Sequence, residues 1–467
     1  MAMKRDLADW LDFIERQHPK SIDMGLDRVR EVAARMGLGQ PAKQVVTVAG
    51  TNGKGSTVAF VESIARAAGW KVGTYTSPHL LRYNERVRID GVEVSDEVLI
   101  EAFETVEHAR LSPSPGGREV GVRVRRSDDG SDIAGSAVPS SAPSGHLLPE
   151  GEGDSVPLTY FEFGTLAALR LFQQAGLDLA VLEVGLGGRL DAVNIVDPDV
   201  AVITTVDIDH ADWLGEDRES IGAEKAGIAR AWKPLVLGEI DSPSSVLRRA
   251  YAIGANALRL GSDFFAEPAG DGHWRWREVG AELELPDPPL PAPAQRHNAA
   301  AAIAALRALP VPPPDSAFAP GIANVRLPGR LQHFERNGVD VFVDVGHNPQ
   351  AARELAAWLD LQPRGAHTFA VYAALADKDA AQVVAAFDDA VARWFLAGID
   401  DAGPRSQTAD ALAAKLAGTA AGGGERHAGV AQALDAALAR ARPGDRVLAF
   451  GSFHTAAAAL AHLDSGR

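Results

Sequence analysis

A glycine-rich stretch with one lysine, VAGTNGKGST at residues 48–57, has the residue types of a phosphate-binding loop. The usual loop reads G-x-x-x-x-G-K-[ST], but here two residues separate Gly50 from Gly53, and a further glycine stands between Lys54 and Ser56. At a helix start, such a loop directs backbone N–H groups and the helix dipole at a phosphate. Lys54 would reach the β- and γ-phosphates, and the Ser56 hydroxyl would lie near the phosphates or their magnesium. The alternative is a purely structural turn.

A second stretch, LEVGLGGRLDAVN at residues 182–194, places Glu183 at the end of an apolar run, directly before a glycine turn. Loops at the carboxyl ends of parallel strands are where α/β proteins bind ligands. Because Mg²⁺ prefers oxygen ligands, Glu183 is a candidate metal ligand. The alternative is a carboxylate that stabilises the turn.

A third stretch, TTVDIDHADWLGEDRESIGAEKAGI at residues 204–228, also follows an apolar run. Asp207, Asp209 and His210 stand at the expected end of that strand, and Lys225 lies downstream on an expected helix. A single histidine is more often structural than a ligand. Three polar groups at one strand end, with a lysine nearby, favour a functional site.

Three further segments carry candidate residues. DVGHNP, residues 344–349, ends a strand with Asp344 and His347 and then begins a helix at its proline. Asn298 stands at the start of an alanine-rich helix, as a cap or as an adenine contact. Arg330 lies close to the expected domain boundary, where it could stabilise a transferring phosphoryl group when the domains close, or be a linker arginine.

Near-continuous apolar runs that alternate with helical patterns predict parallel sheets covered on both faces, which is an α/β fold. The predicted strands are 44–50, 71–77, 178–185 and 199–206, followed by 339–346, 367–375, 393–398 and 445–452. A helix is predicted over about 55–68, and Leu7, Trp10, Leu11 and Ile14 predict an amphipathic helix at the start of the chain.

The length of 467 residues predicts two domains. The proline-rich stretches 287–295 and 311–314 precede a second strand-helix rhythm, so we expect a larger domain at 1–326 and a smaller doubly wound domain at 327–467. Residues 111–156 are rich in Ser, Gly and Pro and are expected to form a disordered insertion.

Composition excludes several classes of function. The chain has no cysteine, which excludes disulfides, zinc-thiolate sites and cysteine nucleophiles and fits a reducing cytoplasm. No apolar run reaches the roughly 18 residues of a membrane span, and the first residues lack a signal core. The net charge of −16 argues against a broad nucleic-acid surface. An anionic ligand would need a local cationic pocket, for which the candidates are Arg82, Arg86, Arg88, Arg189 and Arg330.

Together these segments resemble the Mur-ligase-type ATP-dependent amide ligases, specifically the folylpolyglutamate synthase/dihydrofolate synthase family. The motifs that carry the resemblance are SIDMGLDRV, VAGTNGKGST, YTSPHL, NERVRI, LTYFEFGTLAAL, LEVGLGGRLDAVN, DHADWLGEDRESIGAEKAGI, LPGRLQ, DVGHNP and GSFHTA. They stand in the family's order and cover nearly the whole chain outside 111–156. The extra glycine of the loop is the family's own pattern. The resemblance implies an N-terminal P-loop-type parallel-sheet ATPase domain and a smaller C-terminal Rossmann-like α/β domain.

The resemblance also implies roles for single residues. The residues expected to bind the ATP phosphates are Thr51, Asn52, Gly53, Lys54, Gly55 and Ser56. The other expected ATP contacts are Asn298, Arg330 and Asp344, with Asp344 on the ribose side. Two Mg²⁺ sites are implied: Ser77 and Glu183 at the first, and His210 with Glu183 at the second. Lys225 occupies the place of a lysine that the family carries as N6-carboxylysine, and His347 lies near the phosphates, where it could position the glutamate substrate.

The implied dihydropteroate pocket consists of Asp23, Met24 and Gly25, then Thr159, Tyr160, Phe161 and Glu162, then Leu190, Asp191 and Ala192. These stretches resemble the bifunctional bacterial enzymes, which accept dihydropteroate and reduced folates. The implied partners are small molecules (dihydropteroate, reduced folates, L-glutamate and ATP), with no nucleic acid and no membrane, and the implied state is a cytoplasmic monomer.

The implied chemistry joins a carboxylate to an amine. The γ-phosphoryl group of ATP is transferred to the pteroyl carboxylate, and the glutamate amine then displaces phosphate from the acyl phosphate. Phosphoryl transfer needs positioning and charge neutralisation, which Lys54, Arg330 and magnesium would supply, so no nucleophilic side chain is expected. His210, Lys225 and His347 complete the expected catalytic set.

Three other functions compete with this one. A Mur-type ligase for peptidoglycan precursors or another amino acid is the nearest, and YTSPHL and TYFE argue against it. A GTPase-like switch lacks the N-K-x-D signature and leaves the second domain unexplained. A binding or scaffold protein with an inactive site fits poorly with a phosphate loop, an acid, a histidine and a lysine all present.

Replacement of Lys54 by alanine tests the loop. Because the ammonium is expected to act on charge that develops in the transition state, Lys54→Ala should lower kcat by about 100- to 1,000-fold. The thermal unfolding temperature should change little. Steady-state kinetics with ATP as the varied substrate would measure this, and full activity in the variant would contradict the assignment.

Overall fold

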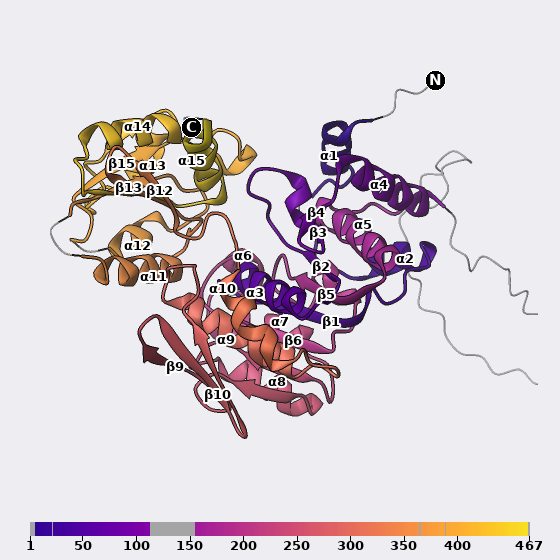
Figure 1. Ribbon diagram of the computed structural model, residues 1–467. Helices are drawn as coiled ribbons and strands as arrows, with labels where there is room; N and C mark the ends of the chain where they lie inside the picture. The colour runs from indigo at the N-terminus through magenta and orange to yellow at the C-terminus, as the bar shows by residue number, and fades with distance from the viewer. Residues whose placement is uncertain (1–4, 21, 113–154, 364–365, 388, 466–467) are drawn as a thin grey trace, which may run out of the picture.

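The computed structural model describes residues 5–20, 22–112, 155–363, 366–387 and 389–465. The first lobe is built on an eight-stranded sheet of order β4-β3-β2-β5-β1-β6-β7-β8 (Figure 1). Its strands are β1 (Ala42–Ala49), β2 (Val72–Tyr75), β3 (Val87–Ile89), β4 (Val92–Glu93), β5 (Leu177–Glu183), β6 (Val200–Ile203), β7 (Pro234–Leu237) and β8 (Asn256–Arg259). Pairing is parallel from β2 to β8 and antiparallel at the β2–β3 and β3–β4 edge.

The second lobe, coloured orange to yellow in Figure 1, holds a six-stranded sheet of order β12-β13-β17-β14-β15-β16. Its strands are β12 (Gln332–Arg336), β13 (Val339–Val343), β14 (Thr368–Tyr372), β15 (Arg393–Ala397), β16 (Glu425–His427) and β17 (Arg446–Phe450). All pairs are parallel except β12–β13. Both lobes therefore have the mixed α/β architecture that the sequence predicts.

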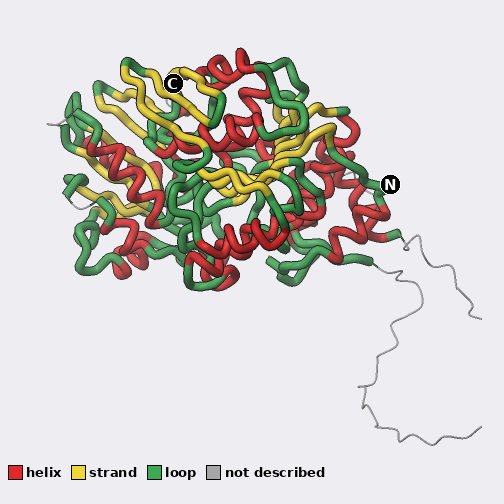
Figure 2. The backbone as a smooth tube through the Cα atoms, turned by 90° about the horizontal axis from the view of Figure 1, so that it is seen from below, coloured by secondary structure: helices red, strands yellow, loops and turns green. Residues whose placement is uncertain are grey.

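Helices cover both main sheets (Figure 2). Those of the first lobe are α1 (Leu7–Glu15), α2 (Asp27–Arg35), α3 (Lys54–Ala67), α4 (Asp96–Leu111), α5 (Tyr160–Ala175), α6 (Ala211–Leu214), α7 (Arg218–Lys225), α8 (Ser244–Ile253), α9 (Ala294–Arg307) and α10 (Phe318–Ala323). Those of the second lobe are α11 (Pro349–Asp360), α12 (Ala380–Ala385), α13 (Ala409–Lys415), α14 (Val430–Arg440) and α15 (Phe453–Ser465). None of the helices in the described ranges is long and apolar enough to cross a membrane.

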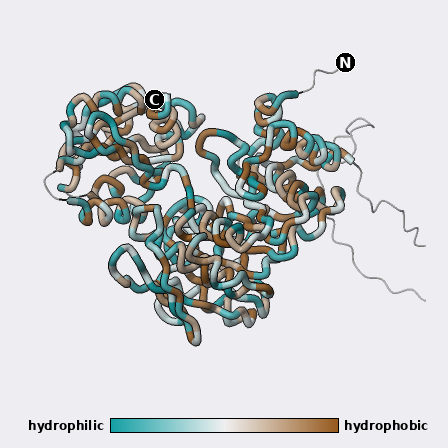
Figure 3. Tube along the Cα trace, in the orientation of Figure 1, coloured by the Kyte–Doolittle hydropathy of each residue, from teal (hydrophilic) through white to brown (hydrophobic). Residues whose placement is uncertain are grey.

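Each main sheet is buried on both faces. In β1, Val45 and Ala49 belong to one apolar cluster, while Val46 and Val48 belong to the cluster on the opposite face. Successive side chains of a strand point to opposite faces, so a strand covered on both faces needs an uninterrupted apolar run. This is why QVVTVAG lacks an alternating pattern. Figure 3 shows the hydrophobic segments concentrated inside each lobe.

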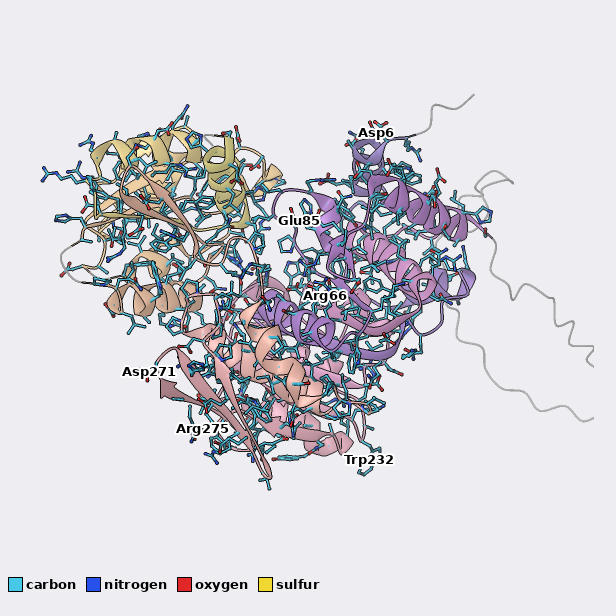
Figure 4. All side chains as sticks on the ribbon, in the orientation of Figure 1. Asp6, Arg66, Glu85, Trp232, Asp271 and Arg275 are labelled. Carbon is cyan, nitrogen blue, oxygen red and sulfur yellow. The ribbon has the colours of Figure 1, made fainter. Side chains whose placement is uncertain are left out.

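All eight predicted strands are present in the two main sheets, with carboxyl ends one to three residues earlier than predicted, and β1 and β5 also begin two and one residues earlier. The predicted helix over about 55–68 is α3. The first helix is α1, which buries Trp10 and Ile14 and is capped by a reciprocal pair of Asp6 and Asp9 (Asp6 is labelled in Figure 4). The expected positions at strand ends are also confirmed, since Glu183 is the last residue of β5 and α3 begins at Lys54.

A third sheet was not predicted. It is antiparallel and consists of β9 (Phe264–Gly270), β10 (His273–Glu278) and β11 (Ala281–Pro286). It packs on α9 through Trp274 and Trp276, both fully buried, and the Trp276 indole donates to the Ala300 carbonyl at 3.2 Å. β10 begins with alternating exposed and buried residues, and β9 and β11 are mostly half-buried or exposed, so the three strands lack the long apolar runs that identify the central strands.

Most of the segment predicted as a disordered insertion, 111–156, lies outside the described residues. The predicted range is too wide at both ends, since Leu111 is the last residue of α4. Val156 is buried, and its N–H donates to the Arg110 carbonyl at 3.0 Å. The end of α4 and the segment leading to α5 therefore lie side by side.

The turn from β1 into the phosphate-type loop requires glycine at residue 50. Gly50 has φ +151°, and a Cβ there would lie 1.8 Å from Thr204 Oγ1. That hydroxyl donates to the Asn52 carbonyl at 2.6 Å, so it cannot move aside without losing a buried hydrogen bond.

We expect Gly50→Ala to lower the free energy of unfolding by about 2 to 4 kcal/mol, because strain and a lost hydrogen bond add together. Gly423→Ala is the matched control, since a Cβ at Gly423 meets no atom within 4 Å, and it should change stability by less than about 0.5 kcal/mol. Urea denaturation would measure both, and equal effects would contradict this account.

Candidate active site

The candidate site lies where three neighbouring strands, β5, β1 and β6, end at the same edge of the sheet. Glu183 is in register with Val48, two residues before the glycine loop. The loop is also tied to the chain after β6: the Thr51 N–H donates to the Thr205 carbonyl at 2.7 Å, and the Thr51 hydroxyl donates to the Asp207 carbonyl at 3.0 Å. The structure thus brings the three predicted loops together.

Lys54 lies at the centre of this edge. Its ammonium group donates to the carbonyls of Gly50 and Thr51, at 3.1 and 3.2 Å, so it is folded back on its own loop. The positive charge of Lys54 also acts on the pKa of four surrounding groups, which are Glu183, Asp191, His210 and Lys225. Lys54 is therefore the common neighbour of the candidate metal ligands and of the candidate modified lysine.

The Glu183 carboxylate is buried at 4% exposure and accepts the Ser77 N–H at 3.2 Å. Burial raises the pKa of this carboxyl, and the charges of Lys54 and Arg330 oppose that rise. Gly55 borders both groups, since a Cβ there would be in ordinary contact with the Arg330 guanidinium at 3.8 Å and with Glu183 Oε2 at 3.9 Å. The three predicted loops and the interlobe arginine therefore meet around one carboxylate.

The residues present fit a magnesium ion bound with phosphates. Ser56 is buried at 1% exposure, and its hydroxyl has no hydrogen-bond partner among the described residues, as expected of an oxygen reserved for a ligand. Within the same described ranges, no three His, Asp or Glu side chains form a ready metal cage. Mg²⁺ usually takes one or two carboxylates together with phosphate oxygens and waters, so the set Ser56, Ser77, Glu183 and His210 is of the right kind.

His210 takes the left-handed conformation, with φ 53°, at the start of α6. Burial lowers the pKa of its imidazole to about 4, and the charge of Asp209 only partly opposes this shift. The ring is therefore neutral at neutral pH, which is the form that binds a metal.

Lys225, at the end of α7, is 4% exposed. Burial, followed by the nearby charge of Lys54, lowers the pKa of its amine to about 7. A large fraction of this amine is then unprotonated at neutral pH. Only a neutral amine can attack carbon dioxide to form a carbamate, so the environment suits the modification that the sequence implies.

Two acids at this strand end contact the other lobe: Asp207 pairs with Arg353 in an exposed contact, and Asp209 makes the buried contacts. Its carboxylate accepts the Lys378 ammonium at 2.5 Å and the Asn348 amide at 3.2 Å, and it lies 3.5 Å from His347 Nε2. Burial alone would raise the pKa of this carboxyl, but hydrogen bonding to His347 and the charge of Lys378 hold it well below the ordinary value. His347 therefore faces Asp209. The closest partner of the Asp209 carboxylate is Lys378, which the sequence did not identify.

Asn52 of the glycine loop also reaches the second lobe. Its amide exchanges hydrogen bonds with the Asn348 amide, both at 3.0 Å, and donates to Gln350 Oε1 at 2.6 Å. Asn348 caps α11 as well, accepting the Ala351 N–H at 2.9 Å. The sequence offered one signal for this role, because Asn-Pro is typical of a capped helix start.

Asn298 lies inside α9, four residues after its start at Ala294, and donates to Gln295 Oε1 at 3.1 Å. The interpretation as a helix cap is therefore wrong. A Cβ at Gly53 would lie 2.4 Å from Asn298 Oδ1, so the amide borders the glycine loop directly. From this position the Asn298 amide can contact a nucleotide bound at the glycine loop.

Asp344 follows β13 and uses both carboxylate oxygens for backbone N–H groups, that of Leu331 at 2.9 Å and that of Gly346 at 2.7 Å. Burial raises the pKa of this carboxyl, and the Arg330 guanidinium opposes the rise. Arg330 itself lies between Asp344 and Glu183 and over the ring of Phe453, 5.6 Å from its centroid.

The predicted pteroate residues lie beside this edge. Arg28, which sequence reasoning missed, donates to Asp23 at 2.6 Å and to Glu162 at 3.0 Å and so joins two of the three stretches. Thr159 and Glu162 form a reciprocal cap at the start of α5, with Thr159 N donating to Glu162 at 2.8 Å. Glu162 is thus already used by its own helix and by Arg28.

Two apolar residues of these stretches flank the glycine turn after β5. A Cβ at Gly185 would lie 2.7 Å from the Phe161 ring, and one at Gly187 would lie 3.6 Å from the Met24 methyl. Asp191 organises that turn, because it accepts the N–H groups of Gly185, Leu186 and Val193 at 2.9 to 3.1 Å. Burial raises the pKa of Asp191 to about 7 despite these bonds. The remaining predicted pteroate residues stand next to these residues in the sequence; they are Gly25, Tyr160, Leu190 and Ala192.

Of the five arginines considered for an anion pocket, three are engaged by acids. The pairs are Arg82 with Asp96, Arg88 with Glu62, and Arg189 with Glu224. Arg86 and Arg330 are the two that lie close enough to Glu183 to affect its pKa.

Comparison with known proteins agrees with this geometry. Residues 155–306 match the Mur ligase middle domain, and residues 329–453 match the Mur ligase, glutamate ligase domain. The chain is 44% identical over 461 residues to the dihydrofolate synthase/folylpolyglutamate synthase of Escherichia coli K12, covering 99% of this chain and 96% of that protein. It is 37% identical to the protein of the same name from Haemophilus influenzae, covering 97% and 96%.

Solved structures agree as well. E. coli FolC in complex with DHPP and ADP superposes with a TM-score of 0.85 at 43% identity, covering 99% of both chains. A bifunctional folylpolyglutamate synthase/dihydrofolate synthase with Mn, AMPPNP and L-glutamate bound gives a TM-score of 0.82 at 40% identity, covering 98% of both chains.

We expect Asp209→Asn to lower the free energy of unfolding by about 3 kcal/mol at pH 7, because it leaves the buried Lys378 ammonium without its counter-charge. The depressed pKa of Asp209 means that its contribution is present above the ordinary aspartate pKa and is lost as the pH falls towards the depressed value. The difference from wild type should therefore shrink as the pH is lowered below about 4.

Urea denaturation at several pH values would measure this. Arg353→Met is the control, since it breaks the exposed pair with Asp207 on the same lobe boundary and should cost less than about 1 kcal/mol. A difference between Asp209→Asn and wild type that does not depend on pH would contradict the assignment.

Proposed function

The chain belongs to the dihydrofolate synthase/folylpolyglutamate synthase family of Mur ligases, and from this premise we propose how its residues carry the reaction. The protein is an ATP-dependent acid–amino-acid ligase that joins L-glutamate to dihydropteroate and to folates. The observation that best supports the residue assignment is the position of Lys54, whose charge acts on Glu183, His210 and Lys225 at once.

In this proposal Lys54 exchanges the carbonyls of Gly50 and Thr51 for the β- and γ-phosphates of ATP. The backbone N–H groups of residues 51–56 and the start of α3 surround the phosphates. Asn298 and Asp344 contact the nucleotide from α9 and from the second lobe. These roles follow the resemblance, and their support is that Asn298 borders Gly53 and that Asp344 lies beside Arg330.

We propose two magnesium sites, held by Ser56, Ser77 and Glu183 at one and by Glu183 with His210 at the other. When bound, magnesium would neutralise phosphate charge and orient the phosphates. The support is the unpartnered Ser56 hydroxyl, the contact between Ser77 and Glu183, and the neutral His210 ring.

The carboxylate of the acceptor attacks the γ-phosphorus, and ADP leaves with the bridging oxygen. Arg330 stabilises the charge on the transferring group, since it borders both Glu183 and the loop. The amine of L-glutamate then attacks the acyl phosphate, loses a proton, and phosphate leaves as the amide forms. We propose that His347, held by Asp209, orients the incoming glutamate.

The acceptor would bind beside the glycine turn after β5. Met24 and Phe161 supply apolar surface there, and the Arg28 cluster with Asp23 and Glu162 supplies polar groups at its edge. Pterin rings need both kinds of contact, because they are flat and carry several hydrogen-bonding atoms. We further propose a cytoplasmic monomer with domains at 1–326 and 327–467, supported by the lack of cysteine and by the family match at 329–453.

The assay is glutamate-dependent release of ADP by the purified protein with ATP and Mg²⁺, comparing dihydropteroate with tetrahydrofolate. Turnover with both acceptors is the expected result. Turnover with tetrahydrofolate alone would contradict the assignment of TYFE to a pteroate pocket. Turnover with neither, but with a nucleotide-sugar acceptor, would favour a peptidoglycan-type Mur ligase.

We propose that Lys225 is carried as N6-carboxylysine. Because burial and the nearby charge of Lys54 lower the pKa of its amine to about 7, carbamate should form readily at pH 8 and decline as the pH falls below 7. Carbon-13 NMR with labelled bicarbonate would follow one carbamate signal, which Lys225→Ala should remove together with activity. A carbamate signal that persists in Lys225→Ala would contradict the assignment.

A further inference from the structure

Arg86 is a buried cation whose only close polar side-chain partner among the described residues is a neutral ring. Arg86 is 9% exposed, and its Nε donates to His79 Nδ1 at 2.9 Å. Burial and the adjacent Arg86 charge lower the pKa of His79 to about 4, so the ring is an uncharged acceptor. No carboxylate of the described residues forms an ion pair with Arg86, unlike Arg82 and Arg88 on the same segment.

The nearest acid in sequence, Glu85, is already used. Its carboxylate accepts the backbone N–H groups of Leu80, Leu81 and Arg82 at 2.6 to 2.7 Å. Figure 4 labels Glu85 on the part of the first lobe that faces the second. The carboxylate thus closes its own loop and is not the counter-ion of Arg86.

Arg86 lies between the candidate metal ligand and the pteroate residues. Its carbonyl accepts the Thr76 N–H at 2.9 Å, one residue before Ser77. Its guanidinium lies over two aromatic rings, 5.3 Å from the centroid of Tyr83 and 5.5 Å from that of Tyr160. The two rings and His79 hold the guanidinium, and no carboxylate of the described residues is hydrogen-bonded to it.

A buried arginine without an acid is costly unless an anion arrives with the substrate. The two acceptors differ in the anions that they bring. Dihydropteroate has one carboxylate, and this carboxylate must react. A folate ends in glutamate and therefore carries two carboxylates. One of these reacts, and the other is spare. Lys54 and Arg330 border the glycine loop, and their charges act on Glu183 more strongly than the charge of Arg86 does, so they serve the reacting carboxylate. Arg86 lies further towards the aromatic pocket.

We propose that Arg86 binds the spare carboxylate of the terminal glutamate of folate acceptors. The inference rests on the proposed function and deepens it, because it assigns a specificity residue to one of the two activities. Arg86 supports ligation to folates, and ligation to dihydropteroate proceeds without its charge. His79 and the two tyrosines act by holding the guanidinium in place.

The test compares both activities in Arg86→Gln. The KM for tetrahydrofolate should rise about 10- to 100-fold, the loss expected for a charge-assisted pair, while kcat and the KM for dihydropteroate change by less than about 2-fold. Arg86→Lys should recover part of the affinity for tetrahydrofolate. Arg82→Gln is the matched control, since it removes the same charge from a 64% exposed side chain of the same segment and should leave both activities unchanged.

A second measurement uses the wild-type protein and does not depend on a folded variant. Tetrahydrofolate with either terminal carboxylate converted to the carboxamide would be assayed, and the amide at the non-reacting position should raise the KM as Arg86→Gln does. In Arg86→Gln the same amide should have no further effect.

Other results would overturn the inference. Equal loss of kcat with both acceptors would place Arg86 at the reacting carboxylate, and a raised KM for L-glutamate with both would place it at the incoming amino acid. An undiminished affinity of the wild type for the amide substrate would also overturn it. Absence of any wild-type turnover would instead remove the proposed function, and this inference with it.

Discussion

One buried carboxylate, that of Asp209, determines how the two lobes meet. A charge out of water is tolerated only when partners compensate it, and here the partners Lys378, Asn348 and His347 all come from the second lobe. Asp209 lies next to His210, so the loop that presents the candidate metal ligand is held by the other lobe. Asn52 extends the same connection into the glycine loop. The phosphate-binding loop and the position of the second lobe are therefore coupled.

Around Lys54 the local charge is opposite to that of the whole protein. The chain carries a net charge of −16, yet three cations, Lys54, Arg330 and Arg86, act on the Glu183 carboxylate. Mutual repulsion and burial leave Lys225 close to half neutral at neutral pH. A site that must hold a triphosphate and one or two carboxylates needs such an excess of positive charge, and the acidic surface keeps anions from binding elsewhere.

The sequence predicted the framework of the fold because the framework depends on local patterns. Continuous apolar runs identified the parallel strands, and polar residues directly after those runs identified the edge where Glu183, His210 and the glycine loop meet. Contacts between distant segments could not be read in the same way. The contacts of Asp207 and Asp209 with the second lobe depend on the placement of α11 and Lys378, about 140 to 170 residues further along the chain. The contacts of Arg28 with Asp23 and Glu162, and those of Asp191 with the glycine turn, could not be predicted for the same reason.

The folded-back position of Lys54 has a consequence for selectivity. The Lys54 ammonium makes two hydrogen bonds to carbonyls of its own loop, so a phosphate ligand gains only the difference between those bonds and the ones that it offers. A single phosphate ion that replaces these two hydrogen bonds gains little binding free energy. A chain of phosphates, which spans the loop and brings its own divalent ion, offers much more. Free phosphate, which is abundant in cells and released in every turnover, therefore binds this loop more weakly than a nucleotide with its divalent ion.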